Sequence, residues 1–278
     1  TIGCLLPLTG KHAMFGERAL NGIQLAIDAL SSRYSQQLNL VVLDTKADPN
    51  VAAEGVHKLY EKNVAAIIGP LLAEQDAGIV AQRLKIPLIA LTQKNEFPLM
   101  GDYLFANFIS PEMQVETLGN YLFNQLGLET VAILYPDERY GRRYMELFWD
   151  VADKHKVRVT GVESYDGTKT DFSEPIQKLT GEFYPVPDVL LPKVPEEPDV
   201  KAVDADKDEP EIEIDFQALF IPDSPSRLNL ILPQLAFNDA TGMYLAGTNL
   251  WHHKSLLEGA KGYYSRAVIT DGFFSSSR

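Results

Sequence analysis

The chain opens with Ile2-Gly3-Cys4-Leu5-Leu6, followed at once by Pro7-Leu8-Thr9-Gly10, and this stretch decides how the rest of the sequence is interpreted. A short apolar run that ends at proline and glycine is typical of a strand buried on both faces of a parallel sheet. Between Ala19 and Leu30 the apolar residues recur at helical spacing, which predicts a helix with one apolar face. The segment therefore predicts a strand, a tight turn and a helix.

The turn itself is a candidate binding element. In open α/β sheets such turns lie at the carboxyl ends of the strands, where ligands bind. Phe15 and Gly16 fall at the start of the predicted helix, whose free N–H groups would be available to an anion. A purely structural turn fits the same residues equally well. Phe15 is nevertheless the first candidate ligand-binding residue.

Composition excludes some classes of function. The 278 residues carry a net charge of −13, which argues against a nucleic-acid partner. Cys4 is the only cysteine, so no intrachain disulfide forms, and its place in an apolar strand predicts a core residue rather than a reactive thiol. No apolar run approaches the length of a membrane span.

Strand and helix patterns alternate strictly through the first hundred residues. The strands are nearly continuous apolar runs, which predicts a parallel sheet with helices on both faces and right-handed crossovers. After the opening strand and helix, the predicted strands are 39–43, 64–68 and 87–91, and the predicted helices are 51–62 and 73–84.

The alternation then restarts, which predicts a second lobe. An extended segment over 103–109 leads to Ser110-Pro111, a pair that suits the beginning of a helix. We therefore expect an α/β fold of two lobes, residues 1–108 and 109–265. The second set of predicted elements comprises helices 111–126, 141–155, 172–179 and 226–237, and strands 130–135, 157–164, 216–221, 244–246 and 267–274.

Residues 184–213 interrupt the second lobe. Six prolines fall in this stretch, and most of the acidic excess of the chain lies within or beside it. Proline and like charge together disfavour packing, which predicts a solvated insertion. A functional acidic arm is the alternative. Ile212 and Ile214 alternate with acids, so the end of the insertion is a candidate short edge strand.

An ordered set of short motifs resembles type I periplasmic binding proteins of the leucine/isoleucine/valine-binding family. The resemblance implies two lobes, each a mostly parallel sheet flanked by helices, with a ligand cleft between them. It also implies residues 266–278 crossing back toward the first lobe, a periplasmic or extracellular location and a membrane ABC permease as partner. The motifs are Leu6-Pro7-Leu8-Thr9-Gly10, Phe15-Gly16, Asn21-Gly22, Ile68-Gly69-Pro70-Leu71, Ile86-Pro87-Leu88-Ile89, Tyr135-Pro136-Asp137, Tyr140-Gly141 and Thr170-Asp171-Phe172-Ser173.

The resemblance also implies ligand-binding positions in the first lobe. The family holds an α-carboxylate with groups that follow the Gly-Pro turn and the fourth strand. Those positions are Leu72 and Ala73, where the usual serine is missing, and Thr92 and Lys94. Lysine at a cleft edge favours an anionic group. An exposed loop lysine is the equal alternative.

In the second lobe the implied ligand-binding positions are Tyr140 and Asn249. Tyr140 matches the cleft tyrosine of the family. Asn249, with Thr248, falls where the family places an acid for an α-ammonium group, and no acid stands there. An amino acid or another small carboxylate is the expected ligand.

A second, shorter resemblance points to a regulatory protein. Ile89-Ala90-Leu91-Thr92-Gln93 and Leu232-Pro233-Gln234-Leu235-Ala236 with Asp239-Ala240 are similar to the binding-protein-like domain of penicillin-binding protein activators. That family keeps the fold without transport, and its partner is a cell-wall synthase.

Motifs for catalysis are missing from the sequence. There is no G-x-S-x-G elbow, no phosphate loop and no H-E-x-x-H. His252-His253, taken as neighbours on a strand, point to opposite faces and suit a shared metal poorly. We therefore expect no catalytic residues, no metal and no cofactor, and a non-catalytic ligand-binding receptor is the leading hypothesis.

Overall fold

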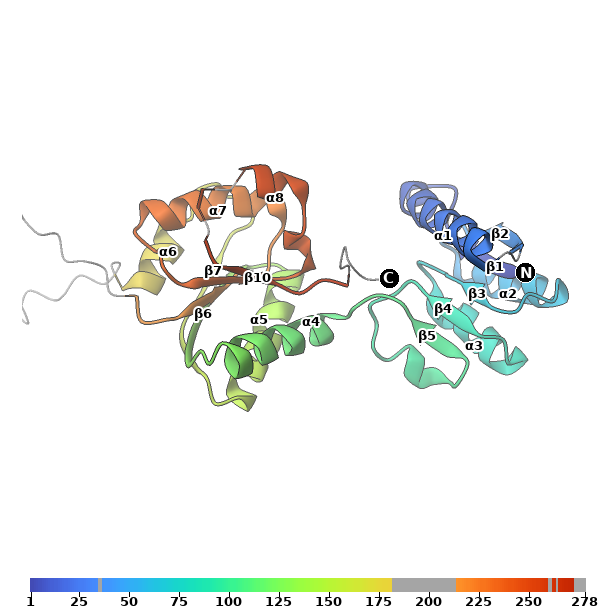
Figure 1. Cartoon of the computed structure of the whole chain (residues 1–278), viewed down its shortest axis with the longest axis horizontal. Coiled ribbons are helices and arrows are strands. Elements are labelled where there is room, and N and C mark those ends of the chain that lie inside the picture. Colours follow the sequence, from blue (N-terminus) through green and yellow to red (C-terminus); the bar gives the residue numbers. More distant parts are fainter. Residues whose placement is uncertain (35–36, 182–213, 260–261, 264, 273–278) are drawn as a thin grey trace, which may run out of the picture. The chain divides into compact units, whose positions relative to one another are not determined.

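The computed structural model describes residues 1–34, 37–181, 214–259, 262–263 and 265–272, and the chain forms two compact units, Thr1–Ser110 and Pro111–Arg278 (Figure 1). Each unit contains one five-stranded sheet in which every strand pair is parallel. Counted along the chain within each unit, the strands lie in the order 2-1-3-4-5 in both sheets. Both units therefore have the same topology, and the predicted α/β class with two parallel sheets is confirmed.

Unit 1 alternates strands and helices as the apolar pattern predicts. Asp48 caps α2 by accepting hydrogen bonds from the backbone N–H groups of Asn50 and Val51, and Pro49 occupies the first helical turn. The elements are β1 (Ile2–Leu6), α1 (Ala13–Tyr34), β2 (Leu40–Asp44), α2 (Pro49–Glu61), β3 (Ile67–Ile68), α3 (Glu74–Leu84), β4 (Leu88–Ala90), the 3-10 helix η1 (Pro98–Met100) and β5 (Leu104–Ala106).

The two faces of the unit 1 sheet are covered unequally. Helices α2 and α3 pack on one face over a continuous buried cluster that includes Leu5, Ile67 and Leu88. On the other face α1 is the covering helix among the described residues, and only Gly16 of α1 is buried (Figure 1). The second face therefore buries much less apolar surface than the first.

Unit 2 contains more helices. Its elements are α4 (Pro111–Gly119), the π-helix η2 (Asn120–Gln125), β6 (Thr130–Pro136), α5 (Arg139–Lys154), β7 (Arg158–Tyr165), α6 (Ser173–Thr180), β8 (Ala218–Phe220), α7 (Pro225–Phe237), β9 (Tyr244–Gly247), the 3-10 helix η3 (Asn249–Trp251), α8 (Lys254–Gly259) and β10 (Ala267–Ile269).

Both faces of the unit 2 sheet are sealed. Helices α6, α7 and α8 cover one face, and α4 and α5 cover the other (Figure 1). Phe148 of α5 stacks on Phe220 of β8 with ring centroids 4.3 Å apart, and both side chains are fully buried. Unit 2 therefore has a buried apolar cluster on each face of its sheet.

Several local predictions differ from the structure. The helix expected over 111–126 changes to π-helical hydrogen bonding at Asn120. His252 and His253 follow the 3-10 helix η3, so the prediction that they are neighbours on a strand is wrong. Ile214 is not in a strand, although it packs against the core. No described helix is long and apolar enough to cross a membrane.

Two predictions concern the end of the chain and the insertion. Strand β10 covers Ala267–Ile269 and pairs with β9 of unit 2, so it is shorter than the predicted 267–274. Residues 273–278 lie outside the described residues, and the return of 266–278 toward the first lobe stays a prediction. The insertion 184–213 also lies outside the described residues.

Candidate functional site at the carboxyl edges of the sheets

Parallel strands bring all their carboxyl ends to one edge of each sheet. The loops after β1, β3 and β4 meet at this edge in unit 1, and the loops after β6, β8 and β9 meet in unit 2. The candidates Phe15, Leu72, Ala73, Thr92 and Lys94 thus belong to the first edge. Tyr140 and Asn249 belong to the second edge. The topology brings each set together, and ligand binding by these residues stays a prediction.

The same close approach of helix to turn occurs in both units. A Cβ added at Gly16 would lie 2.1 Å from the carbonyl oxygen of Pro7, and one added at Gly141 would lie 2.1 Å from that of Pro136. Such contacts are far inside van der Waals distance, so only glycine fits. The glycines of the Phe15-Gly16 and Tyr140-Gly141 motifs therefore set how closely α1 and α5 approach the carboxyl edges.

The start of α1 differs from the sequence prediction. The N–H groups of Phe15 and Gly16 both donate to the carbonyl of His12, at 3.1 and 3.3 Å. These two donors are used within the turn, so neither is available to an anion, whereas the sequence analysis expected free N–H groups at this helix start. The Phe15 side chain remains half exposed at this edge.

Asp44, at the end of β2, holds the first turn in place. Its carboxylate accepts hydrogen bonds from the Leu8 N–H at 2.8 Å, the Thr9 hydroxyl at 2.6 Å and the Lys46 N–H at 2.9 Å. Partial burial by itself raises the pKa of Asp44, but these hydrogen bonds outweigh it and the pKa lies below the usual value. The sequence indicated only a strand end here.

Lys94 has a counter-ion inside unit 1. Its ammonium nitrogen lies 2.5 Å from Oε1 of Glu74, the first residue of α3. The Glu74 side chain is only 6% exposed, whereas that of Lys94 is 52% exposed. The Lys94 N–H also donates to the hydroxyl oxygen of Thr92 at 3.3 Å. Lys94 is therefore half of an ion pair, which neither of the two sequence interpretations anticipated.

Ala73, the residue before α3, turns the chain so that Glu74 begins the helix. It adopts the left-handed conformation with φ 62°, so the chain turns sharply between Leu72 and Glu74. A negative side chain in the first turn of a helix is favoured by the helix dipole. An acid at the start of a predicted helix could be recognised in the sequence. The ion pair of Glu74 with Lys94 could not, because Lys94 follows a different strand.

Tyr140 is held by one partner from its own helix α5, Tyr144, and by one from the segment after β9, Thr248. Its hydroxyl lies 3.0 Å from Oγ1 of Thr248, and its ring centroid lies 4.6 Å from that of Tyr144. Burial, which outweighs the hydrogen bond to Thr248, raises the pKa of Tyr140. The tyrosine is consequently a neutral, oriented group beside the loop after β9.

Asn249 is positioned by Gln114, a buried residue of α4 that the sequence analysis missed. The Asn249 N–H donates to Gln114 Oε1 at 3.0 Å, and Gln114 Nε2 donates to the Tyr144 hydroxyl at 3.0 Å. Gln114 thus ties the start of α4 to both α5 and the loop after β9. An ordinary glutamine in a helix carries no sequence signal for this role.

A second missed network surrounds Asp223, which is fully buried beyond β8. It accepts from the Tyr165 hydroxyl, and Nε of Arg227 lies 2.7 Å from its carboxylate. Arg227 also donates through Nη1 to Oε1 of Glu138 at 2.6 Å. Burial first, and then the Asp223 charge, raise the pKa of Tyr165. The network joins the ends of β6, β7 and β8, and Arg227 is the cation that Glu138 and Asp223 share.

Comparison with known proteins decides the family. The model of the family described as "Periplasmic binding protein" matches residues 1–183. The chain belongs to the periplasmic binding protein family. This confirms the resemblance drawn from the ordered motifs, and it covers all of unit 1 and the first part of unit 2.

Curated relatives of this periplasmic binding protein include two with related names. The Leu/Ile/Val-binding protein BraC3 of Rhizobium johnstonii is 21% identical over 155 residues, covering 53% of this chain and 42% of that protein. The Leu/Ile/Val-binding protein homolog 3 of Brucella melitensis is 23% identical over 194 residues, covering 64% and 50%. The chain spans about half the length of the curated relatives it matches.

Solved structures show the same fold. The branched-chain amino acid transporter substrate-binding protein LivJ from Streptococcus pneumoniae, in complex with isoleucine, matches with a TM-score of 0.58 and 20% identity, covering 99% of this chain and 71% of that chain. A putative branched-chain amino acid ABC transporter from Rhodospirillum rubrum matches with a TM-score of 0.77 and 13% identity, covering 99% and 72%.

Metal binding has no support in the described part of this periplasmic binding protein. No group of three or more His, Cys, Asp or Glu residues among the described residues is arranged to hold a metal ion. His252 contacts the Asp271 carboxylate through Nδ1, whereas Nδ1 of His253 lies 2.7 Å from the Ser255 hydroxyl. The two histidines therefore serve different partners.

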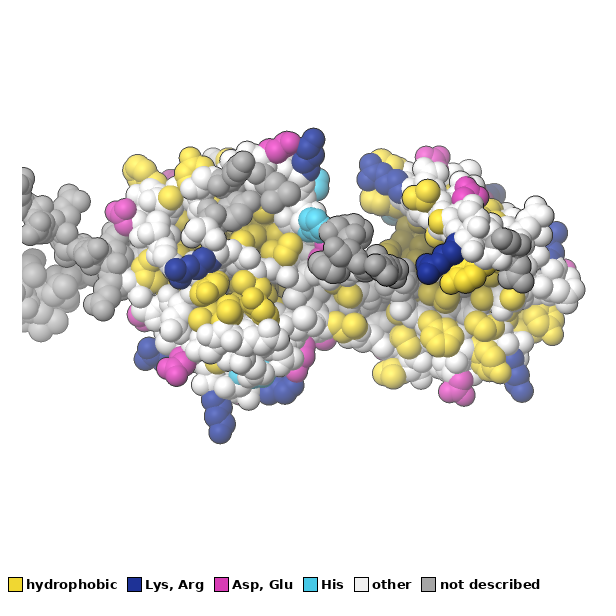
Figure 2. Space-filling view, in the orientation of Figure 1, with side chains coloured by type: hydrophobic (Ala, Val, Ile, Leu, Met, Phe, Trp, Pro, Cys, Tyr) yellow, Lys and Arg dark blue, Asp and Glu magenta, His cyan; other side chains and the backbone are white. Residues whose placement is uncertain are grey.

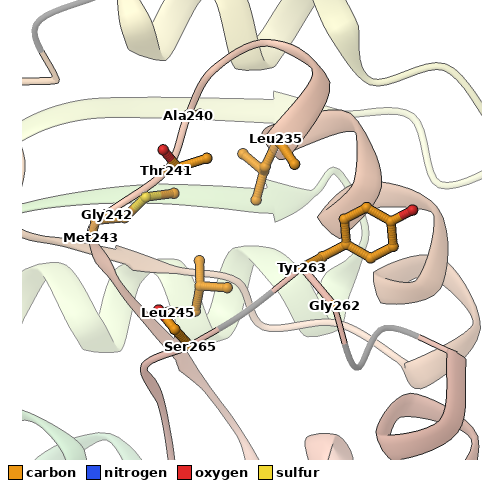
Figure 3. A pocket seen from close by; sticks show the side chains of 10 residues that line it. Leu235, Ala240, Thr241, Gly242, Met243, Leu245, Gly262, Tyr263 and Ser265 are labelled. Atoms are coloured by element: carbon orange, nitrogen blue, oxygen red, sulfur yellow. The ribbon is translucent and has the colours of Figure 1, made fainter.

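Of two hollows, the one in unit 1 reaches Leu91 and Asn107, just beyond the carboxyl ends of β4 and β5, and the one in unit 2 lies near the start of β9. One, of about 240 Å³, lies between the end of α7 and the start of β9, and Figure 3 shows Leu235, Met243 and Tyr263 around it. The other, of about 520 Å³, lies between α1 and the unit 1 sheet, where Figure 2 shows a hollow with hydrophobic side chains. Neither contains the candidate residues Lys94 or Tyr140.

Proposed function

We propose that this periplasmic binding protein is a non-catalytic receptor for a small organic solute outside the cytoplasm, and that it delivers the solute to a membrane ABC permease. Family membership carries the proposal, because the relatives and the solved structures bear names of binding proteins. The two units act as the two lobes, and each contributes ligand contacts from the carboxyl edge of its own sheet. Amino acids are the first class to test, since relatives are named for leucine, isoleucine and valine.

Tyr140 is the residue on which this receptor function depends most clearly. Its half-buried ring is oriented by Tyr144 and its hydroxyl by Thr248, so it offers a preorganised surface to a ligand. Tyr140→Ala should weaken solute binding by about tenfold or more through lost contact area. Tyr121→Ala is the matched control, because Tyr121 is an exposed tyrosine on η2 of the same unit.

The experiment is a thermal-shift screen of amino acids, small carboxylates, sugars and peptidoglycan fragments, followed by calorimetry on each hit. Small-angle scattering with and without a confirmed ligand then tests closure of the two units by hinge motion. A ligand that binds tightly without changing the radius of gyration would contradict closure.

One observation favours a second function, regulation of a cell-wall synthase. The polar groups at both edges already have partners within their own unit: Lys94 pairs with Glu74, and Tyr140 with Thr248. An edge satisfied in this way suits a protein that keeps the fold without binding a solute. If no compound in the screen raises the melting temperature and a pull-down recovers a cell-wall synthase, the receptor proposal is wrong.

A further inference from the structure

The ion pair at the edge of unit 1 combines an exposed cation with a buried anion. Glu74 begins α3 with its side chain 6% exposed, and Lys94 follows β4 with its side chain 52% exposed. The contact is ionic in character: Nζ of Lys94 lies 2.5 Å from Oε1 of Glu74, but that buried oxygen accepts no hydrogen bond among the described residues. Within the described part of the chain, Lys94 is thus the one cation paired with this oxygen.

A lone lysine at the carboxyl edge of a parallel sheet would attract a ligand carboxylate. Here a carboxylate of the protein already takes that place. A second carboxylate approaching Lys94 would meet the buried negative charge of Glu74 at close range, where solvent screens poorly. Glu74 could not easily move away from a ligand carboxylate, because its backbone is fixed at the first turn of α3.

From this geometry we infer that Glu74 is a specificity-determining residue, which rejects ligands that present a free carboxylate to the edge of unit 1. The inference rests on the proposed receptor function and narrows its ligand class. The solute presents a neutral polar group, such as an amide or hydroxyl, to this edge. Specificity by such a repulsive element is a general device of binding sites.

The test compares isoleucine, which carries a carboxylate, with isoleucinamide, in which that group is a neutral amide. Calorimetry is done on wild type, Glu74→Gln and the double variant Glu74→Gln/Lys94→Met. Glu74→Gln should strengthen isoleucine binding by about tenfold or more, since the positive charge of Lys94 is then no longer paired and can bind the ligand carboxylate. Isoleucinamide should respond less than threefold, and the added Lys94→Met should remove the gain.

Two controls keep the result interpretable. Glu54→Gln removes an acid from another ion pair of unit 1, the exposed pair of Glu54 with Lys58 at 2.8 Å, and should leave isoleucine binding unchanged. Glu74→Ser repeats the test without a side chain that reaches Lys94, and the melting temperature of each variant shows that it is folded.

The inference is overturned if folded Glu74→Gln and Glu74→Ser bind isoleucine no better than wild type, including the case in which none of them binds it. It is also overturned if the gain survives Lys94→Met. Failure of the receptor proposal looks different: wild type would then bind no solute of any class, whereas a gain of isoleucine binding in the variants would still be measurable.

Discussion

The two units have the same strand order, but their sheets are covered differently. In unit 2 both sheet faces carry large buried clusters, one under α6, α7 and α8 and one under α4 and α5. In unit 1 the face under α2 and α3 is equally well buried, whereas the buried residues of the cluster under α1 are Cys4, Leu6 and Leu91. Strand order therefore fixes which face of the sheet a core residue points to, whereas the helices that cover that face fix how deeply the residue is buried and how much it contributes to stability.

The largest effect should come from the sealed core of unit 2. Phe148→Ala removes a fully buried ring that stacks on Phe220, and should lower the free energy of unfolding by about 3–5 kcal/mol. Urea unfolding followed by circular dichroism measures it. Trp149→Ala is the control, since Trp149 is the next residue of α5 and is exposed; a similar loss for both variants would contradict the picture of a sealed face.

The next test compares the two faces of unit 1 within one strand. Ile67 and Ile68 are consecutive in β3, and they point to the α2/α3 face and to the α1 face respectively. Ile67→Ala should cost about 2–5 kcal/mol because its side chain is fully buried. Ile68→Ala should cost less than about 1.5 kcal/mol, since a half-buried side chain leaves a smaller cavity. Equal losses would show that the α1 face is as well packed as the other.

Substitution and labelling of Cys4 test whether the small cluster under α1 excludes solvent. Cys4→Ser should cost about 1–3 kcal/mol, because it places a hydroxyl in an apolar site. Burial raises the pKa of the Cys4 thiol to about 12, so the native protein should resist alkylation near pH 8. Mass spectrometry of protein treated with iodoacetamide, with and without urea, measures this. Rapid labelling of the folded protein would show that α1 opens readily.

The smallest effect on stability should come from Asp44, which holds the turn at Leu8 and Thr9 that precedes α1. The pKa of Asp44 is lowered in the folded state, so its contribution to stability is present above the unfolded pKa and lost as the pH falls through the folded pKa. Asp44→Asn should therefore be less stable than wild type at neutral pH, and the difference should shrink below about pH 4. Urea unfolding at several pH values measures it. A gap between the two proteins that stays constant with pH would contradict the role of the carboxylate charge.

Much of the fold was predictable because apolar periodicity is local. The strand at Ile2–Leu6 and the helix at 226–237 were predicted within a residue of their observed ends. The π-helix η2 was not, since nothing in Asn120–Gln125 separates it from an ordinary helical pattern. Strand β10 was predicted too long: it ends at Ile269, where the apolar run gives way to Thr270, Asp271 and Gly272.

The candidate site divides in the same way. The sequence placed Tyr140 and Lys94 in loops after strands; the structure has Lys94 in the loop after β4, whereas Tyr140 is the second residue of α5, just beyond β6. It did not reveal their partners Thr248 and Glu74, because each pair joins residues that follow different strands. Gln114 and Asp223 were missed for the same reason: polar residues of common type acquire a role only through neighbours distant in sequence.

The alternation of strands and helices, the parallel sheets and the repeated unit were all predictable from the amino-acid sequence, and the ordered motifs pointed to the family. These follow from hydrophobic period and from turn residues, which act over a few positions. Three features became visible only in the folded chain: Lys94 is paired with Glu74, the N–H groups of Phe15 and Gly16 are hydrogen-bonded, and one face of the unit 1 sheet is thinly covered. Charge pairing and burial depend on distances between segments far apart in the chain, and no local pattern encodes them.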